Sequence, residues 1–163
     1  MLIRPATRAD LDGIVAIYND AVASSDATFD VEPVEVAARV PWLVQFGDEH
    51  PLLVAQGEAG AVLGFAYYLP YRIKPAYAAS KETTVYVSRD ARRRGVASAL
   101  YGALIAHARA QRVHVLIAVL GGDNPESRAL HAKLGFTFTG RLPQVGFKFG
   151  RWVDTEFFAK VLV

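Results

Sequence analysis

The segment that most constrains the fold is ETTVYVSRDARRRGVASALYGALI, from Glu82 to Ile105, in which a strand leads through a basic turn into a helix. β-Branched residues dominate its first part and favour a strand. Val96, Leu100 and Leu104 then recur at helical spacing. The first amides of such a helix have no intrahelical partner and lie at the positive end of its dipole. The turn therefore predicts an anion site suited to a pyrophosphate.

The residues of the turn fit this role. Gly95 lets a ligand approach the backbone closely, and the small Ala97 and Ser98 leave the first helical turn uncrowded. The arginines at 92–94 add charge for a further phosphate. The segment lacks both GxxxxGK[ST] and GxGxxG, so it is neither a P-loop nor a dinucleotide fingerprint. A solvated basic turn that only caps the helix is the alternative interpretation.

The rest of the chain predicts an α/β mixture around one sheet. We expect strands at 2–7, 52–56, 61–69, 82–88, 113–120, 136–142 and 150–163, and helices at 7–25, 33–46, 96–111 and within 121–136. Pro41 would kink or split the second helix, and Gly135 would end the last one. The hairpin at 52–69 implies antiparallel pairs and argues against a purely parallel sheet. No linker or repeat interrupts the chain, so we expect one domain, 1–163.

Composition and charge exclude several classes of function. The 163 residues are enough for a substantial core, and the formal net charge of +2 favours no nucleic-acid partner. The absence of cysteine excludes disulfides, thiolate nucleophiles and thiolate metal sites. The charged N-terminal segment and the lack of a long apolar run lead us to expect a cytoplasmic protein with no membrane partner. His50, His107 and His114 share no ligand spacing, so no metal is expected.

The basic turn also resembles a known family. RRRGVA resembles the [Q/R]-x-x-G-x-[G/A] motif of the GNAT superfamily of acyl-CoA-dependent N-acetyltransferases. ETTVYVS, NPESRALHAKLGF, PQVGFKFGRWVDTEF, TFDVEP and YRIKPAY are similar to the branch of phosphinothricin and methionine sulfoximine or sulfone acetyltransferases, in the same order along the chain. The resemblance implies the GNAT fold: one mixed, mostly antiparallel sheet with helices on both faces and a splayed pair of parallel strands.

The resemblance also implies acetyl-CoA as cosubstrate, bound where the parallel strands separate. Val85, Tyr86 and Val87 would pair their backbone with the pantetheine arm. The residues that would wrap the pyrophosphate are Arg92, Arg93, Arg94, Gly95, Val96, Ala97 and Ser98. Asn124 and Ser127 would touch the arm from the next helix, although Asn124 before a proline is also a good helix cap.

Two residues are candidates for the chemistry of acetyl transfer to an amine. Glu82 lies where the family places its acid, and burial would raise its pKa towards the range of a general base, acting directly or through water. A solvent-exposed glutamate is the alternative. His131 stands where many GNAT enzymes have a tyrosine that protonates the departing thiolate, and a histidine can also donate a proton; otherwise it is a packed or surface residue. A backbone N–H near Val87 would stabilise the oxyanion.

The loop before Glu82 is the expected substrate site. Arg72 would grip an amino acid's carboxylate, because a guanidinium binds carboxylates bidentately. The other candidate substrate residues are Tyr71, Ile73, Lys74 and Tyr77 of the loop, Thr83 and Thr84, and Phe29, Phe147 and Lys148, which would close the pocket. The alternative for the aromatic residues is a place in the core, and the alternative for the basic residues is exposure to solvent. Relatives commonly form dimers, and we expect a homodimer.

These features lead to an N-acetyltransferase of a small amino-acid-like amine, of the phosphinothricin, methionine sulfoximine or methionine sulfone type. Its role is detoxification or, as the alternative, housekeeping. Acetylation of another amine is an alternative within the same class: a polyamine, an antibiotic or a protein N-terminus. A non-catalytic acyl-CoA-binding sensor is an alternative from another class. It would keep the RRRGVA turn but would not need Glu82, His131 and Arg72 together.

Overall fold

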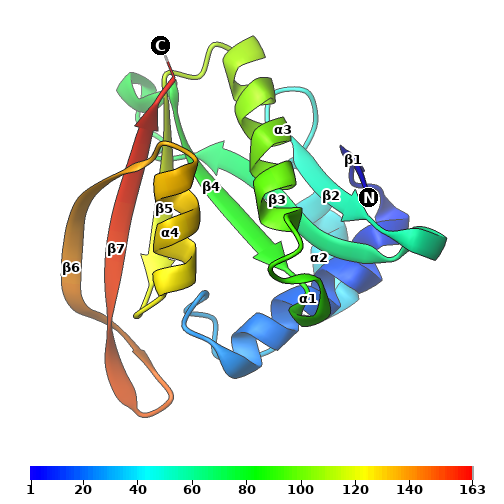
Figure 1. Cartoon of the computed structure of the whole chain (residues 1–163), viewed down its shortest axis with the longest axis horizontal. Helices are drawn as coiled ribbons and strands as arrows, with labels where there is room; N and C mark the ends of the chain where they lie inside the picture. Colours follow the sequence, from blue (N-terminus) through cyan, green and yellow to red (C-terminus); the bar gives the residue numbers. More distant parts are fainter. Residues whose placement is uncertain (163) are drawn as a thin grey trace.

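The structure is a computed structural model, and it describes residues 1–162. Within these residues seven strands form one sheet and four α-helices cover it (Figure 1). The strands are β1 Leu2–Pro5, β2 Leu52–Gln56, β3 Val62–Pro70, β4 Ser80–Val87, β5 Val115–Gly121, β6 Thr137–Lys148 and β7 Arg151–Val161. The helices are α1 Leu11–Ser24, α2 Val36–Leu43, α3 Val96–Ala110 and α4 Pro125–Lys133.

The strand order in the sheet is β1-β2-β3-β4-β5-β7-β6. Every neighbouring pair is antiparallel except β4 and β5, which are parallel and lie on either side of α3 in the sequence. This topology confirms the mixed, mostly antiparallel sheet and its one parallel pair.

The helices lie on both faces of the sheet. In Figure 1, α3 and α4 cover one face, and α1 and α2 cover the other. One core cluster packs between the sheet and α3 and includes Leu100, Leu104 and Leu116. A second cluster packs under α1 and includes Ile14, Ile17 and Phe65. The central strands of the sheet are therefore packed on both faces.

The predicted order of elements is confirmed, with changes in extent. The second helix is shorter than predicted, because Glu35 keeps an extended backbone and the helix starts only at Val36, with Pro41 inside it. Residues 143–148, predicted to connect the last two strands, continue β6 past an irregularity between Leu142 and Gly146. The strand tolerates Pro143 because β6 is at the edge of the sheet. The last residue of the predicted C-terminal strand, Val163, lies outside the described residues.

A buried ion pair holds the N-terminal strand to the start of α1. Arg4 donates to both carboxylate oxygens of Asp10, at 2.7 and 2.8 Å, and the Thr7 amide donates to Oδ2 at 2.7 Å. Asp10 is 4% exposed, and the hydrogen bonds from Arg4 lower its pKa to about 2. A shift of this size corresponds to about 2 kcal/mol of folding free energy.

We expect Asp10→Asn to reduce the free energy of unfolding by about 2 kcal/mol at neutral pH. The folded-state pKa of Asp10 is below its unfolded value, so its contribution is present above about pH 4 and is lost as the pH falls towards 2. Urea unfolding of both proteins across this range would measure the difference. A difference that stays constant as the pH falls would contradict the assignment to the Asp10 carboxylate.

Candidate active site

The parallel strands β4 and β5 separate part of the way along their length. They pair from Ser80–Val115 to Thr83–Ala118, but β4 continues to Val87 and β5 to Gly121. On its other side β4 stays paired with β3 up to Val87. Beyond Thr83, one edge of β4 therefore has no strand partner within residues 1–162, which confirms the splayed pair.

Two hollows meet at this opening. The first, here called the inner pocket, has a volume of about 330 Å³, and its lining includes Glu82–Tyr86 of β4, Ala118–Gly121 of β5 and residues 26–29. The second, here called the α3 groove, has a volume of about 420 Å³ and follows the start of α3. Ala27, Val85, Tyr86, Asn124 and Ser127 line both hollows. A ligand in the groove could therefore extend one end into the inner pocket.

The α3 groove has the features of an anion site. Gly95 is the N-cap of α3 with φ +80°, a conformation that favours glycine, and nothing lies within 4 Å of where its Cβ would be. The lining at this turn is Ala91, Arg92, Arg93, Gly95, Val96, Ala97 and Ser98. Arg94 is exposed and lies outside the lining. The open helix N-terminus and the flanking arginines are well suited to a pyrophosphate.

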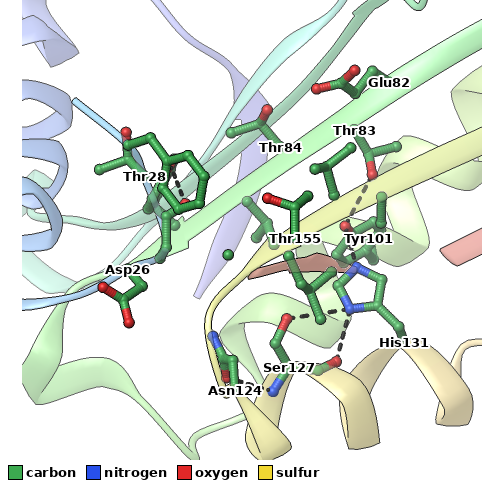
Figure 2. A pocket seen from close by; sticks show the side chains of 18 residues that line it. Asp26, Thr28, Glu82, Thr83, Thr84, Tyr101, Asn124, Ser127, His131 and Thr155 are labelled. Atoms are coloured by element: carbon green, nitrogen blue, oxygen red, sulfur yellow. Dashed lines mark hydrogen bonds between the residues drawn. The ribbon is translucent and has the colours of Figure 1, made fainter. Parts of the chain in front are cut away.

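Glu82 lines the inner pocket near the point where the strands separate. Successive β4 side chains alternate: Figure 2 shows Glu82 and Thr84 on one side of the strand and Thr83 on the other, towards Tyr101. Glu82 is half-buried, and burial raises the pKa of its carboxyl, while the positive charge of Arg72 opposes this shift. A carboxylate with a raised pKa is a better proton acceptor than an ordinary glutamate.

His131 lies at the opposite wall, in a chain of hydrogen bonds that runs from α4 to β4 (Figure 2). Its Nε2 is 2.8 Å from the Tyr101 hydroxyl, which is 3.1 Å from Oγ1 of Thr83. Its Nδ1 is 2.7 Å from the carbonyl oxygen of Ser127. His131 is 2% exposed, and burial lowers its pKa in spite of the opposing hydrogen bond to Ser127.

This arrangement fixes the protonation of neutral His131. The Ser127 carbonyl can only accept, so the network assigns the hydrogen to Nδ1. Nε2 then accepts from the Tyr101 hydroxyl. The neutral imidazole thus has no free N–H to offer, and its link to a ligand in the inner pocket is through the hydroxyl of Tyr101.

Tyr101 is a site residue that the sequence analysis missed. It is 1% exposed and comes from α3, whereas the GNAT resemblance directs attention to position 131 on α4. A signal was present in the sequence, because Tyr101 lies one helical turn before Leu104 and follows Leu100 on the apolar stripe. A phenol on a buried helix face usually has a hydrogen-bond partner.

Eight other predicted ligand residues line one or both of the hollows. Val85, Tyr86, Asn124 and Ser127 line both hollows, Val87 lines the α3 groove, and Phe29, Thr83 and Thr84 line the inner pocket. The Asn124 side chain also accepts from the Ser127 amide at 2.9 Å, so it caps α4 as well. The two interpretations of Asn124, cap and ligand contact, are therefore compatible.

The 71–77 loop lies outside the lining of both hollows as formed by the described residues. Arg72 is exposed, and its guanidinium stacks over the Tyr71 ring at 4.2 Å. Tyr77 packs edge-on against Tyr71, while Lys74 is exposed and Ile73 is 99% exposed. The loop influences the site electrostatically, because the positive charge of Arg72 lowers the pKa of Glu82.

Phe147 and Lys148 also lie outside the lining of the inner pocket in the described residues. The Phe147 ring is 58% exposed and packs against Trp152. Lys148 is buried, and its Nζ donates to the carbonyl oxygens of Ser25 and Thr28. The two side chains differ because neighbouring residues of a strand point to opposite faces.

Two features are absent from the described part of the chain. Residues 1–162 contain no cluster of three or more histidine, aspartate or glutamate side chains that could hold a metal ion. None of their helices combines the length and the apolar character needed to cross a bilayer.

The separated parallel strands, the open helix N-terminus and the adjoining carboxylate form an arrangement suited to a transferase that takes a group from an anionic carrier. Comparison with known families identifies the carrier chemistry: residues 3–157 match the acetyltransferase (GNAT) domain. The chain therefore belongs to the GNAT acetyltransferases, and the family predicted from its motifs is confirmed. The protein is an acyltransferase, and GNAT acetyltransferases use acetyl-CoA.

Individual relatives agree with this assignment. The chain is 45% identical to an L-methionine sulfoximine/L-methionine sulfone acetyltransferase of Pseudomonas paraeruginosa, over 95% of this chain and 91% of the relative. A phosphinothricin acetyltransferase from Sinorhizobium meliloti, solved with acetyl-CoA, has a TM-score of 0.95 at 38% identity, covering 99% of this chain and 88% of the other. A structure titled ribosomal-protein-alanine N-acetyltransferase, from Brucella melitensis, has a TM-score of 0.95 at 45% identity, covering 99% and 100%.

Proposed function

We propose that the protein transfers the acetyl group of acetyl-CoA to the amine of a small amino-acid-like substrate, of the phosphinothricin, methionine sulfoximine or methionine sulfone type. The observation that carries the proposal is the half-buried Glu82 in an inner pocket that shares a wall with the α3 groove. This arrangement would place the Glu82 carboxylate close to the thioester of an acetyl-CoA molecule bound in the α3 groove. The names of the Pseudomonas and Sinorhizobium relatives support the substrate type.

The cosubstrate is proposed to bind along the α3 groove. The unpaired edge of β4 at Val85, Tyr86 and Val87 offers backbone groups to an extended amide-containing arm. The turn at 92–98 offers helix amides and arginine charges to the phosphates. Asn124 and Ser127 line both hollows and would contact the arm where it enters the inner pocket.

Glu82 is proposed as the general base. An ammonium must lose a proton before it can attack a thioester, and a carboxylate with a raised pKa can accept that proton directly or through water. As the new C–N bond forms and the C–S bond breaks, a backbone N–H near Val87 would stabilise the charge on the carbonyl oxygen.

The thiolate leaving group must gain a proton, and His131 is proposed to supply it through Tyr101. The Tyr101 hydroxyl would give its proton to sulfur while it takes the Nε2 proton of the imidazolium form of His131, which becomes neutral. Their 2.8 Å contact supports this transfer. Burial lowers the pKa of His131, so its imidazolium is a stronger acid than a solvated one but forms a smaller fraction of the protein at neutral pH, and neutral His131 must take up a proton from solvent before each transfer.

The substrate carboxylate is proposed to bind Arg72, with the rest of the 71–77 loop covering it. Arg72 is exposed and has no ion-pair partner within residues 1–162, and its charge already acts on Glu82. A carboxylate held there would bring an α-amine towards Glu82. Phe29, Thr83 and Thr84 would then contact the substrate from the lining of the inner pocket.

Thiol release from acetyl-CoA against a panel of amines tests this function. The panel holds phosphinothricin, methionine sulfoximine, methionine sulfone, spermidine and a peptide with an N-terminal alanine. We expect turnover with the first three. Turnover with the peptide alone would overturn the substrate proposal. It would favour acetylation of a protein N-terminus, the activity for which the Brucella melitensis relative is named. Binding of acetyl-CoA without turnover of any amine would favour a sensor.

We further propose that residues 1–163 act as one domain that forms a homodimer and works in the cytoplasm, where its role is detoxification of amino-acid analogues. The dimer is supported by exposed apolar side chains on the edge hairpin β6–β7: Phe138, Leu142, Val145, Phe147, Phe149 and Trp152. Such a surface is unusual on a monomer and typical of an interface. In Figure 1 this hairpin extends beyond the rest of the sheet.

We expect the double substitution Phe147→Ser and Trp152→Ser to convert a dimer into a monomer, because it removes a packed and exposed aromatic pair. Light scattering after size-exclusion chromatography would measure the mass. Val44→Ser is the matched control, since Val44 is 81% exposed at the end of α2. A wild-type protein that is already a monomer at high concentration would contradict the proposal.

A further inference from the structure

One wall shared by the two hollows is an irregular segment between α1 and α2, residues 25–30, here called the strap. Asp26, Ala27, Thr28 and Phe29 line the inner pocket, and Ser25 and Ala27 line the α3 groove. Its backbone carbonyls have no helix or sheet ladder to pair with, so other groups must hold the strap in place.

The tip of the β6–β7 hairpin supplies two cations for this purpose. Lys148 donates from Nζ to the carbonyl oxygens of Ser25 at 2.7 Å and Thr28 at 2.8 Å. Arg151 donates to Oδ2 of Asp26. Lys148 and Arg151 face each other in the strand register, on either side of the turn at Phe149 and Gly150. The hairpin therefore binds the strap at Ser25, Asp26 and Thr28.

The strap is also held from the side of β4 and α1. The Tyr86 hydroxyl donates to the Ala27 carbonyl at 3.1 Å. The Tyr18 hydroxyl is 2.9 Å from Oγ1 of Thr28 and also donates to Asp30. Tyr86 joins the strap to β4, the strand that also carries Glu82, and Tyr18 joins it to α1.

Three glycines let the strap lie close to the sheet. A Cβ on Gly121 or Gly122 would come within 3.0 Å of Asp26, and a Cβ on Gly146 would come within 3.0 Å of the Phe29 ring. Gly146 is on the same face of β6 as Lys148. The strap thus sits against the ends of β5 and β6 with no room for a methyl group, and its position sets the width of the inner pocket.

Lys148 is the central anchor in this arrangement. It is 3% exposed, and its two acceptors are three residues apart on either side of Asp26 and Ala27. One ammonium has three N–H donors, enough to bind both carbonyls, whereas an apolar side chain has none. We propose that Lys148 is a positioning residue, which fixes the strap and thereby determines which amines the inner pocket accepts. This inference rests on the proposed use of that pocket for the amine.

Lys148→Met tests the inference, because methionine keeps an unbranched apolar stem and removes the ammonium. We expect KM for the best amine of the panel to rise about tenfold or more, because a displaced pocket wall loses contacts that the amine makes equally in the ground state and the transition state. The kcat value and the dissociation constant of acetyl-CoA should change less than about threefold. Lys133→Met, at an exposed position at the end of α4, is the matched control and should change none of these.

Two further measurements keep the test decisive. Arg151→Gln, on the surface, should raise KM for the amine in the same direction by a smaller factor, even if Lys148→Met folds poorly. Hydrogen exchange should show faster exchange of amides in residues 25–30 in Lys148→Met but not in Lys133→Met. Slower kcat with unchanged KM, or unchanged exchange in the strap of a folded variant, would overturn the inference. Exchange in the strap also remains testable if no amine is turned over, which separates this inference from the proposed function.

Discussion

Glu82→Gln is expected to lower kcat by a factor of about 10² to 10⁴, the range in which general acid–base catalysis contributes. The amide keeps the size of the side chain but cannot accept the proton of the attacking ammonium. Glu82 lies in the inner pocket and outside the lining of the α3 groove, so the dissociation constant of acetyl-CoA should stay within about twofold. Steady-state kinetics and calorimetric titration would measure the two effects separately.

The pH profile gives an independent test of the same role. A base acts when deprotonated, so activity should fall as the pH drops through the pKa of Glu82. Burial raises this pKa, which places the loss at a higher pH than for an ordinary glutamate. Arg72→Gln removes the opposing charge and should move the acid limb to still higher pH. Glu82→Gln with the turnover and acid limb of the wild type would exclude Glu82 as the base.

Tyr101→Phe is expected to have the next largest effect, a fall in kcat of about 10²-fold. The substitution removes the hydroxyl that links His131 to the inner pocket and leaves Nε2 of a buried imidazole without its donor. The loss should be largest with poor thiol leaving groups, because the proton delivered to sulfur matters most there. Kinetics with acetyl thioesters of different thiol pKa would measure this dependence.

The protein contains a matched control for this experiment. The hydroxyl of Tyr68 is 2.8 Å from Nδ1 of His107, in a second tyrosine–histidine pair that lies outside both hollows and in which the tyrosine is buried and the histidine half-buried. Both substitutions, Tyr68→Phe and Tyr101→Phe, should reduce the free energy of unfolding. We expect about 1–3 kcal/mol for Tyr101→Phe, which leaves the buried His131 without its partner, and less for Tyr68→Phe, because the half-buried His107 can bind water instead. Only Tyr101→Phe should lower kcat. Equal losses of kcat in both variants would assign the effect to stability rather than to proton transfer.

Much of the fold could be predicted from local sequence. The β-branched run before Ser88, the glycine at 95 and the apolar spacing from Val96 onward define a strand, turn and helix without tertiary information. The extent of β6 could not be predicted in this way. Pro143 and Gly146 favour a loop locally, and only pairing with β7 at the sheet edge keeps residues 143–148 in the strand.

The site was predictable where one motif supplies both the residue and its environment. Gly95 and the helix amides are adjacent in sequence, and Glu82 belongs to the same β-branched segment that forms β4. Tyr101 and the strap were not predictable in their roles, because their partners are remote: Tyr101 meets His131 across 30 positions, and Lys148 meets Ser25 across 123. Lys148 could be singled out as a functional residue, but its orientation towards the strap is a consequence of strand register.

The short pairing between β4 and β5 has a thermodynamic consequence. Only residues 80–83 of β4 pair with β5, so residues 84–87 of this central strand have no strand partner on that edge. On the proposed binding mode, the extended arm of acetyl-CoA acts as the missing strand. Binding of the cosubstrate then adds hydrogen bonds to the open edge of the sheet. By mass action the free energy of unfolding rises with the concentration of acetyl-CoA. The lifetime of the enzyme is thereby coupled to the supply of its own cosubstrate.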